Sequence, residues 1–221
     1  MNVVSPILPS AQRQADPGPA GAGAGLASAI RPAVVLVAVF TLLTGVALPL
    51  GFVGIGHAVL PYQAGGSLIE RDGKVVGSAL IGQAFTGDGY FHSRPSATTD
   101  TDPQDSAKQV PAPYNAAASL ASNMGATSKD LVARVKEAVT TAGPAPVPAD
   151  AVTTSASGLD PHVTPANAAR QMARVAAARG MPDDQVRALV AENTEGRLLG
   201  LVGEPRVNVL RLNLALDAAQ R

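Results

Sequence analysis

Residues 33–53, AVVLVAVFTLLTGVALPLGFV, decide the architecture of this chain because they contain no charged side chain. Thirteen of these residues are Val, Leu or Phe, and each such residue favours the centre of a bilayer by roughly 0.3–0.6 kcal/mol. At a rise of about 1.5 Å per residue, a helix of this length spans roughly 30 Å, which matches the hydrocarbon core of a membrane. We therefore predict one transmembrane helix, with an anchor at residues 31–58.

Two other interpretations of this apolar segment can be weighed. A buried core helix is apolar on one face, whereas this segment is apolar on all sides. A cleaved signal peptide has a shorter apolar stretch close to the N-terminus, yet here about 30 residues precede it. We favour a retained anchor. Cleavage after Ala58, which would release a secreted binding domain, is the alternative.

The charges near the span say little about its orientation. Arg13 and Arg31 precede it, and Arg71 and Lys74 follow it, so the positive-inside rule gives nearly a tie. The chain has no cysteine, so nothing in it depends on a reducing compartment. We expect the C-terminal domain to lie outside the cytoplasm.

Composition divides the rest of the chain into two parts. Residues 1–30 are rich in Ala, Gly, Pro and Ser, which cannot bury enough surface to offset ordering, so we expect a disordered tail. Residues 61–221 number about 160, enough for one compact domain. The net charge is zero and only 3% of residues are aromatic, which argues against nucleic-acid binding.

The domain begins with a predicted β-hairpin. Residues 68–78 place the turn Asp72-Gly73 between two short apolar runs, and Asp-Gly is a strong hairpin signal. Gly77 and Gly82 suggest a bulge or a close approach of backbones. Residues 98–112 are a loop by composition.

Helical signals follow in the second half of the domain. A helix over 114–124 would end at Gly125, and the next, over 129–142, would start at the T-x-x-D signal of Thr127. Two more are predicted, one capped by Thr164 and ending before Gly180, the other starting at Pro182-Asp183-Asp184. Val207 to Val209 read as a strand that extends through Leu216 or gives way to a terminal helix. The fold class is α+β, a small sheet packed by helices, with strands paired from opposite ends of the domain.

The richest cluster of reactive side chains is SGLDPH, residues 157–162. Ser157, Asp160 and His162 offer a hydroxyl, a carboxylate and an imidazole, so a membrane-tethered extracytoplasmic hydrolase is one hypothesis. The segment matches no nucleophile signature, and a polar capping loop explains it more simply. The acidic residues 100–105 do not complete a calcium loop, and we predict no metal site.

Five phrases occur in a fixed order along the chain, and together they resemble the KdpC family, the C subunits of bacterial P-type potassium-transporting ATPases. They are Gly77–Phe85 (GSALIGQAF), Tyr90–Ala97 (YFHSRPSA), Ser157–His162 (SGLDPH), Gln171–Gly180 (QMARVAAARG) and Gly203–Asp217 (GEPRVNVLRLNLALD). The resemblance runs from the span to the C-terminus, and the stretch 123–128 departs from the family pattern.

This resemblance implies a non-catalytic accessory subunit of a high-affinity, ATP-driven potassium uptake pump in the bacterial cell membrane. Its partners would be the potassium-conducting subunit, the ATP-hydrolysing subunit and a small single-span subunit. The family's proposed role is a catalytic chaperone that raises the pump's affinity for ATP. Gln83 ends L-I-G-Q, similar to a shortened ABC-transporter signature, which implies a nucleotide contact. A strand-end Gln bonded to backbone is the alternative.

We also hypothesise a docking role for the aromatic and arginine side chains of residues 90–97. On an irregular loop, Tyr90, Phe91 and Arg94 could seat the domain over the outer mouth of the potassium-conducting subunit. The same block could instead fill the core of the domain.

Overall fold

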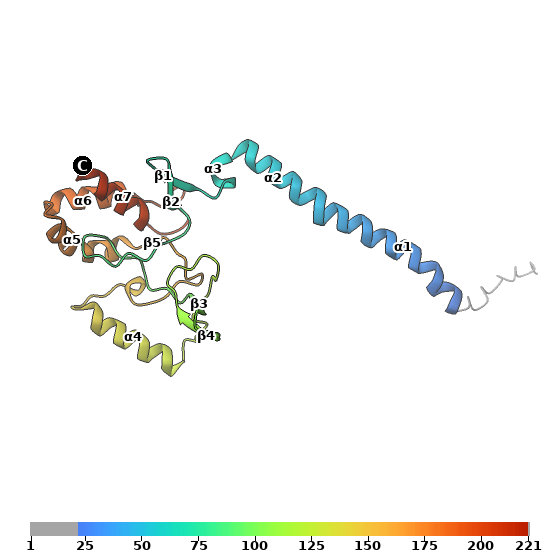
Figure 1. Ribbon diagram of the computed structural model, residues 1–221, viewed down its shortest axis with the longest axis horizontal. Helices are drawn as coiled ribbons and strands as arrows, with labels where there is room; N and C mark the ends of the chain where they lie inside the picture. The colour runs from blue at the N-terminus through green and yellow to red at the C-terminus, as the bar shows by residue number, and fades with distance from the viewer. Residues whose placement is uncertain (1–21, 221) are drawn as a thin grey trace, which may run out of the picture. The chain divides into compact units, whose positions relative to one another are not determined.

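The computed structural model describes residues 22–220 and divides into two units, one ending at Pro61 and one beginning at Tyr62 (Figure 1). The first unit is a helix made of α1 (Ala22–Leu42), a π-helical turn (Leu43–Ala47) and α2 (Leu48–Val59). A one-turn helix, α3 (Pro61–Ala64), follows it.

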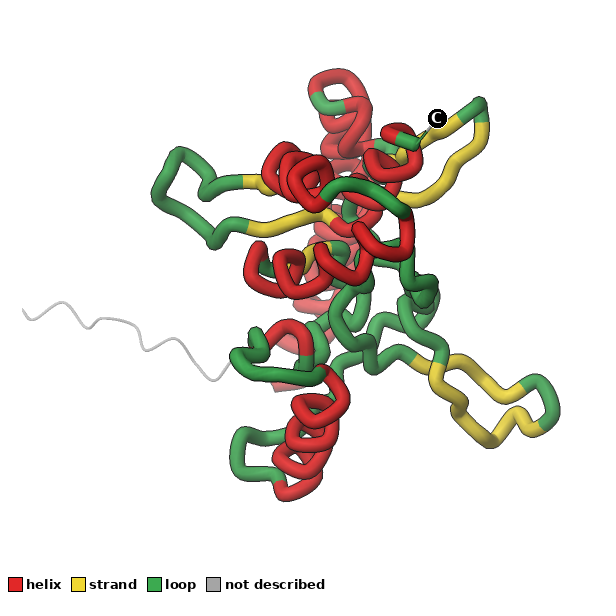
Figure 2. Tube along the Cα trace, turned by 90° about the vertical axis from the view of Figure 1, so that its left-hand side faces the viewer, coloured by secondary structure: helices red, strands yellow, loops and turns green. Residues whose placement is uncertain are grey.

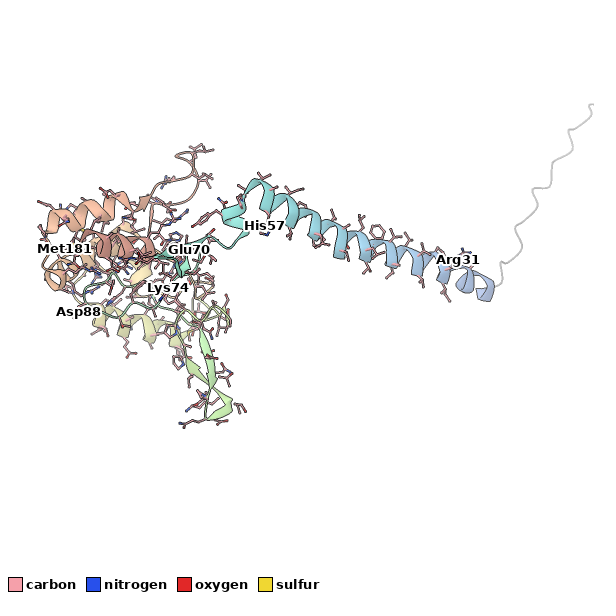
Figure 3. All side chains as sticks on the ribbon, turned by 45° about the horizontal axis from the view of Figure 1, so that its top comes forward. Arg31, His57, Glu70, Lys74, Asp88 and Met181 are labelled. Carbon is pink, nitrogen blue, oxygen red and sulfur yellow. The ribbon has the colours of Figure 1, made fainter. Side chains whose placement is uncertain are left out.

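The predicted anchor is helical throughout. Ser28–Val59 forms 32 helical residues with a mean hydropathy of 2.5, long and apolar enough to cross a membrane. Figure 3 labels Arg31 and His57 near the two ends of this stretch. The helix begins at Ala22, so the part of the expected tail over 22–30 is helical, and residues 1–21 lie outside the described residues.

The π-helical turn has a cause in the sequence. Pro49 has no N–H to donate, and its ring clashes with the carbonyl four residues earlier, at Gly45. Widening the helix over Leu43–Ala47 relieves that clash. The Thr44 hydroxyl donates a 2.6 Å hydrogen bond to the Phe40 carbonyl.

The second unit is α+β, as predicted, with antiparallel pairing in three small sheets. Two of the sheets are hairpins, β1 (Leu68–Arg71) with β2 (Lys74–Ser78) and β3 (Thr99–Asp102) with β4 (Asp105–Pro111). The third sheet has three strands in the order β5 (His162–Val163), β7 (Arg206–Asn208) and β6 (Thr194–Glu195). The helices of this unit, after α3, are α4 (Lys129–Ala142), α5 (Pro165–Arg179), α6 (Asp183–Glu192) and α7 (Val209–Ala219). In Figure 2 several of the strands, drawn in yellow, extend outward from the helices, and a short one lies among them.

The first hairpin and helices α5 and α6 confirm predictions made from local sequence signals. Asp72 and Gly73 have φ of 53° and 72°, as the predicted turn requires. Thr164 caps α5 by accepting from the Asn167 N–H, and Gly180 ends it with a φ of 64°. Helix α6 begins at Asp183, with Pro182 as its N-cap residue. Helix α4 occupies 129–142 as expected, but its cap is Ser128 rather than Thr127.

Two predictions over residues 98–124 were wrong. Residues 98–112 contain the hairpin β3–β4, most of whose residues are exposed. Because this hairpin lacks a buried face, its sequence lacks the alternation that marks a strand. Residues 114–124 are irregular rather than helical, with φ of 63° at Tyr114 and 50° at Asn123. The Tyr114 N–H donates to the Ser96 hydroxyl, so a side chain from a distant loop helps to fix this segment.

The C-terminal segment is a short strand followed by helix α7. The strand ends at Asn208, whose side chain accepts from the Arg211 N–H and caps α7, so the extended-strand alternative is wrong and the helical one is confirmed. The two hairpins pair strands that are adjacent in sequence, and the three-stranded sheet uses strands between residues 162 and 208. Pairing between opposite ends of the domain is therefore also wrong.

The core lies where α5, α6, α7 and the three-stranded sheet meet. It comprises Phe91, Val163, Ala168, Val175, Ala176, Met181, Val186, Val190, Val207, Val209, Leu212 and Leu216. Phe91 is the largest fully buried side chain among the described residues, so the block 90–97 contributes this one side chain to the core.

Gly82 confirms the predicted close approach of backbones and yields a test. A methyl group there would overlap the Tyr114 ring and lie 2.7 Å from the Asp160 carbonyl oxygen. We predict that Gly82→Ala lowers the free energy of unfolding by about 1–3 kcal/mol, because the packed segments must move apart. Nothing lies within 4 Å of the same position at Gly125, so Gly125→Ala should change it by less than about 0.5 kcal/mol. Urea unfolding of the complete chain in detergent measures both, and equal losses would contradict the packing argument.

Candidate functional site

The folded domain brings together three of the phrases singled out in the sequence. The Gly82 N–H donates to the Leu159 carbonyl at 2.8 Å, and the Ser96 hydroxyl donates to the Gly158 carbonyl at 2.7 Å. These bonds join segments 77–85, 90–97 and 157–162. Residues separated by more than 60 positions therefore form one polar cluster.

Arg94 is the centre of that cluster. Its Nη1 lies 3.0 Å from Asp160 Oδ2, and the two side chains are 21% and 28% exposed. Its Nη2 also donates to the carbonyls of Thr153 and Thr154, each at about 3.3–3.4 Å. The Tyr114 hydroxyl donates to the Arg94 carbonyl at 2.6 Å. We call Arg94, Tyr114, Thr153, Asp160 and His162 the Arg94 cluster.

Electrostatics in the Arg94 cluster favour an ionised Asp160. Burial by itself raises the pKa of this carboxyl, but hydrogen bonds from the His162 side chain and backbone and from Arg94 outweigh it, so the pKa lies below its ordinary value. Burial also raises the pKa of Tyr114 to about 12. The Tyr114 phenol is therefore a neutral hydrogen-bond donor at physiological pH.

The proposed hydrolase residues do not form a catalytic arrangement. His162 Nδ1 lies 3.3 Å from Asp160 Oδ1, which would suit a base and its orienting carboxylate. The Ser157 hydroxyl instead accepts the Leu159 N–H at 3.1 Å, and no hydrogen bond joins it to His162 in the described part of the chain. His162 lines a cavity of about 270 Å³ and Ser157 lines another of about 530 Å³, with Arg94 and Asp160 in the walls of both.

The Gln83 side chain is held by the backbone of its own domain. Its Nε2 donates to the Val76 carbonyl at 2.8 Å, and it packs against Gly77, where a methyl group would overlap the amide. The Gln83 carbonyl accepts the Ser93 hydroxyl at 2.9 Å. The backbone bond of the alternative is therefore present, but Gln83 lies in a loop rather than at a strand end, because β2 ends at Ser78.

The three residues of the docking hypothesis have different environments. Phe91 is fully buried, so it is unavailable to a partner, and this part of the hypothesis is corrected. Arg94 is engaged within the Arg94 cluster. Tyr90 is half-buried, with its ring 5.6 Å from that of Phe85 and 4.6 Å from the Arg179 guanidinium. Tyr90 and Arg94 are therefore both partly exposed, whereas Phe91 is not.

Two structural residues gave no signal in the sequence. Asp150, only 8% exposed, accepts from the Thr164 N–H and hydroxyl and from the Asn167 amide, which fixes the start of α5. Asn213 binds the backbone of Phe91. Over residues 22–220, no group of three or more His, Cys, Asp or Glu side chains is arranged to hold a metal ion.

Comparison with known proteins decides the family. A family model described as KdpC, the c chain of the K⁺-transporting ATPase, matches residues 30–218. This chain belongs to the KdpC family. A potassium-transporting ATPase KdpC subunit from Rhodopseudomonas palustris (strain BisB18) is 60% identical over 195 residues, covering 86% of this chain and 98% of the relative. Subunits with the same description from Bradyrhizobium diazoefficiens and Methylorubrum populi are 61% and 57% identical, covering 86% and 87% of this chain and 96% and 98% of those relatives.

In this KdpC-family chain, the Arg94–Asp160 pair should contribute to stability. Arg94→Ala removes the donor to Asp160 Oδ2 and to the carbonyls of Thr153 and Thr154, so we predict a loss of about 1.5–3 kcal/mol. Arg197→Ala is the matched control, because its pair with Glu204 is 47% and 79% exposed and should contribute below about 1 kcal/mol. Chemical unfolding of both variants gives the comparison. A similar loss in each would refute the role given to Arg94.

The depressed pKa of Asp160 predicts an acid-dependent loss of stability. The carboxyl has an ordinary pKa of 3.8 and a lower one in the folded KdpC domain, so its contribution is complete above 3.8 and disappears as pH falls through the folded pKa. Asp160→Asn should remove this part of the pH dependence. The test is to measure the free energy of unfolding of the wild-type and Asp160→Asn proteins as the pH is lowered through 3.8. If both lose stability with the same dependence on pH, Asp160 is not the group responsible.

Proposed function

We propose that this KdpC-family chain is a non-catalytic accessory subunit of a high-affinity, ATP-driven potassium uptake pump. The observation that supports this proposal is that the reactive side chains of its motifs form hydrogen bonds and ion pairs inside the domain. Arg94, Asp160 and His162 bond one another or the backbone, and Ser157 faces a different cavity from His162. These contacts support a scaffold, in which motif residues determine the shape of the domain.

We propose that the chain is a single-pass protein with its C-terminal domain outside the cytoplasm. The span supports membrane attachment, and the absence of cysteine is compatible with an oxidising compartment. Its partners in this proposal are the potassium-conducting subunit, the ATP-hydrolysing subunit and a small single-span subunit. In this proposal the partly exposed residues Tyr90 and Arg94 of the block 90–97 contact one of them.

We further propose that any increase in the pump's ATP affinity comes through contacts between subunits. In an external domain, Gln83 would be separated from cytoplasmic ATP by the bilayer, about 30 Å thick. Its amide is also already bonded to Val76. Coupling across the membrane then requires a conformational equilibrium of the complex that this subunit biases.

The test is the assembled pump, purified with wild-type or variant subunit. We predict that Gln83→Ala and His162→Ala leave the KM for ATP of potassium-stimulated hydrolysis within about twofold of wild type, whereas omission of the subunit raises it severalfold or prevents assembly. A rise of about tenfold with Gln83→Ala in an intact complex would favour a direct nucleotide contact. Hydrolase activity of the chain alone that His162→Ala abolishes would favour an enzyme.

A further inference from the structure

A cavity of about 460 Å³ lies between helix α5, the C-terminal end of α4 and residues 92–95, apart from the Arg94 cluster. Helix α5 supplies its polar wall with Asn167, Arg170, Gln171 and Arg174. These positions are spaced by three or four residues, so they share one face of the helix. We call this space the α4–α5 cavity.

Two arginines line the α4–α5 cavity. Arg170 and Arg174 are one helical turn apart, where like charges repel, and no Asp or Glu is among the described residues that line the cavity. Neither arginine has a carboxylate within ion-pair distance in the described part of the chain. Guanidinium groups carry a positive charge in proteins.

Each guanidinium is held in place by neutral carbonyl groups. Arg170 Nη2 donates to the Ala142 carbonyl at 2.7 Å, at the C-terminal end of α4. Arg174 donates to the carbonyls of Asp88 and Tyr90 at 2.6 and 3.0 Å. Burial lowers the pKa of Arg174, and the charge of Asp88, at the periphery of the domain in Figure 3, offsets this only in part. The arginines are thus fixed in position without being neutralised.

One donor of this pair has no acceptor. Arg170 Nη1 is buried and makes no hydrogen bond, which is costly for a charged group. Because Nη1 is covered by its neighbours, the Arg170 guanidinium would have to rotate for an anion in the cavity to reach this atom. Such a contact would complete its hydrogen bonds and supply the missing negative charge.

We propose that the α4–α5 cavity binds a phosphate-bearing anion through Arg170 and Arg174. Guanidinium forks match phosphate oxygens geometrically and form strong, charge-assisted hydrogen bonds. The volume lies in the range of small-molecule sites and exceeds what one phosphate group needs. Gln171 and His92 fix the cavity wall, because the His92 N–H donates to Gln171 Oε1 at 2.7 Å and Gln171 Nε2 donates back to the His92 carbonyl at 3.1 Å. This site is independent of the pump role.

The test is calorimetric titration of the complete chain in detergent with two separate probes, inorganic pyrophosphate and a short-chain phosphatidylglycerol. We expect saturable binding of at least one probe, and Arg170→Gln should weaken it about tenfold. Arg187→Gln removes the same charge from an exposed position on α6 and should leave it unchanged. The probe that binds identifies the source, a soluble phosphate compound or a lipid headgroup.

A second variant keeps the test valid if Arg170→Gln unfolds. Ala142→Asp places a carboxylate in the wall of the cavity, where it neutralises Arg170 and should abolish binding with the arginines intact. Circular dichroism and the unfolding temperature verify that each variant is folded. Failure of both probes to bind, or equal losses in Arg170→Gln and Arg187→Gln, would overturn the proposal.

Discussion

Two buried asparagine side chains hold together a domain that has little regular sheet. Asn213 Oδ1 accepts the Phe91 N–H at 2.9 Å and its Nδ2 donates to the Phe91 carbonyl at 3.0 Å, so α7 pairs with this loop residue as a strand would. Asn208 caps α7 and donates to the Ala79 carbonyl at 2.8 Å. Both asparagines are at most 2% exposed. The free-energy penalty of leaving a buried backbone group unpaired is larger than the net stabilisation from a hydrogen bond. The domain therefore requires these contacts.

These side-chain amides satisfy backbone groups in the segments 77–85 and 90–97, so polar residues of the family segments have a structural role. Phe91 can fill the core only because Asn213 satisfies its backbone, and Arg94, three residues later, then reaches Asp160. The Val209 N–H donates to the Pro161 carbonyl at 3.0 Å, which joins α7 to the same region. A polar, internally bonded domain on a membrane anchor is consistent with a subunit that acts through contacts with larger partners.

The sequence predicted those features that local physics determines. The Asp72-Gly73 turn and the cap at Thr164 depend on a few adjacent residues, and both were found where expected. The hairpin β3–β4 and the irregular segment 114–124 were missed, because their hydrogen bonds come from distant residues or from strands without a buried face. The same distinction holds for the site. The Asp160–His162 turn could be predicted as a capping loop from adjacent residues. The bond of Asp160 to Arg94 could not be predicted, because the two residues are 66 positions apart in the sequence.

The most direct test of the scaffold account is hydrogen exchange at the Phe91 amide, followed by NMR in the complete chain. Phe91 lies outside every helix and strand, so backbone regularity alone gives it no protection. The account predicts exchange only upon global unfolding, with a protection free energy equal to that of the core of α5, and a large loss of protection in Asn213→Ala. Rapid exchange of Phe91 in the wild-type chain, at the rate of an open loop, would contradict it.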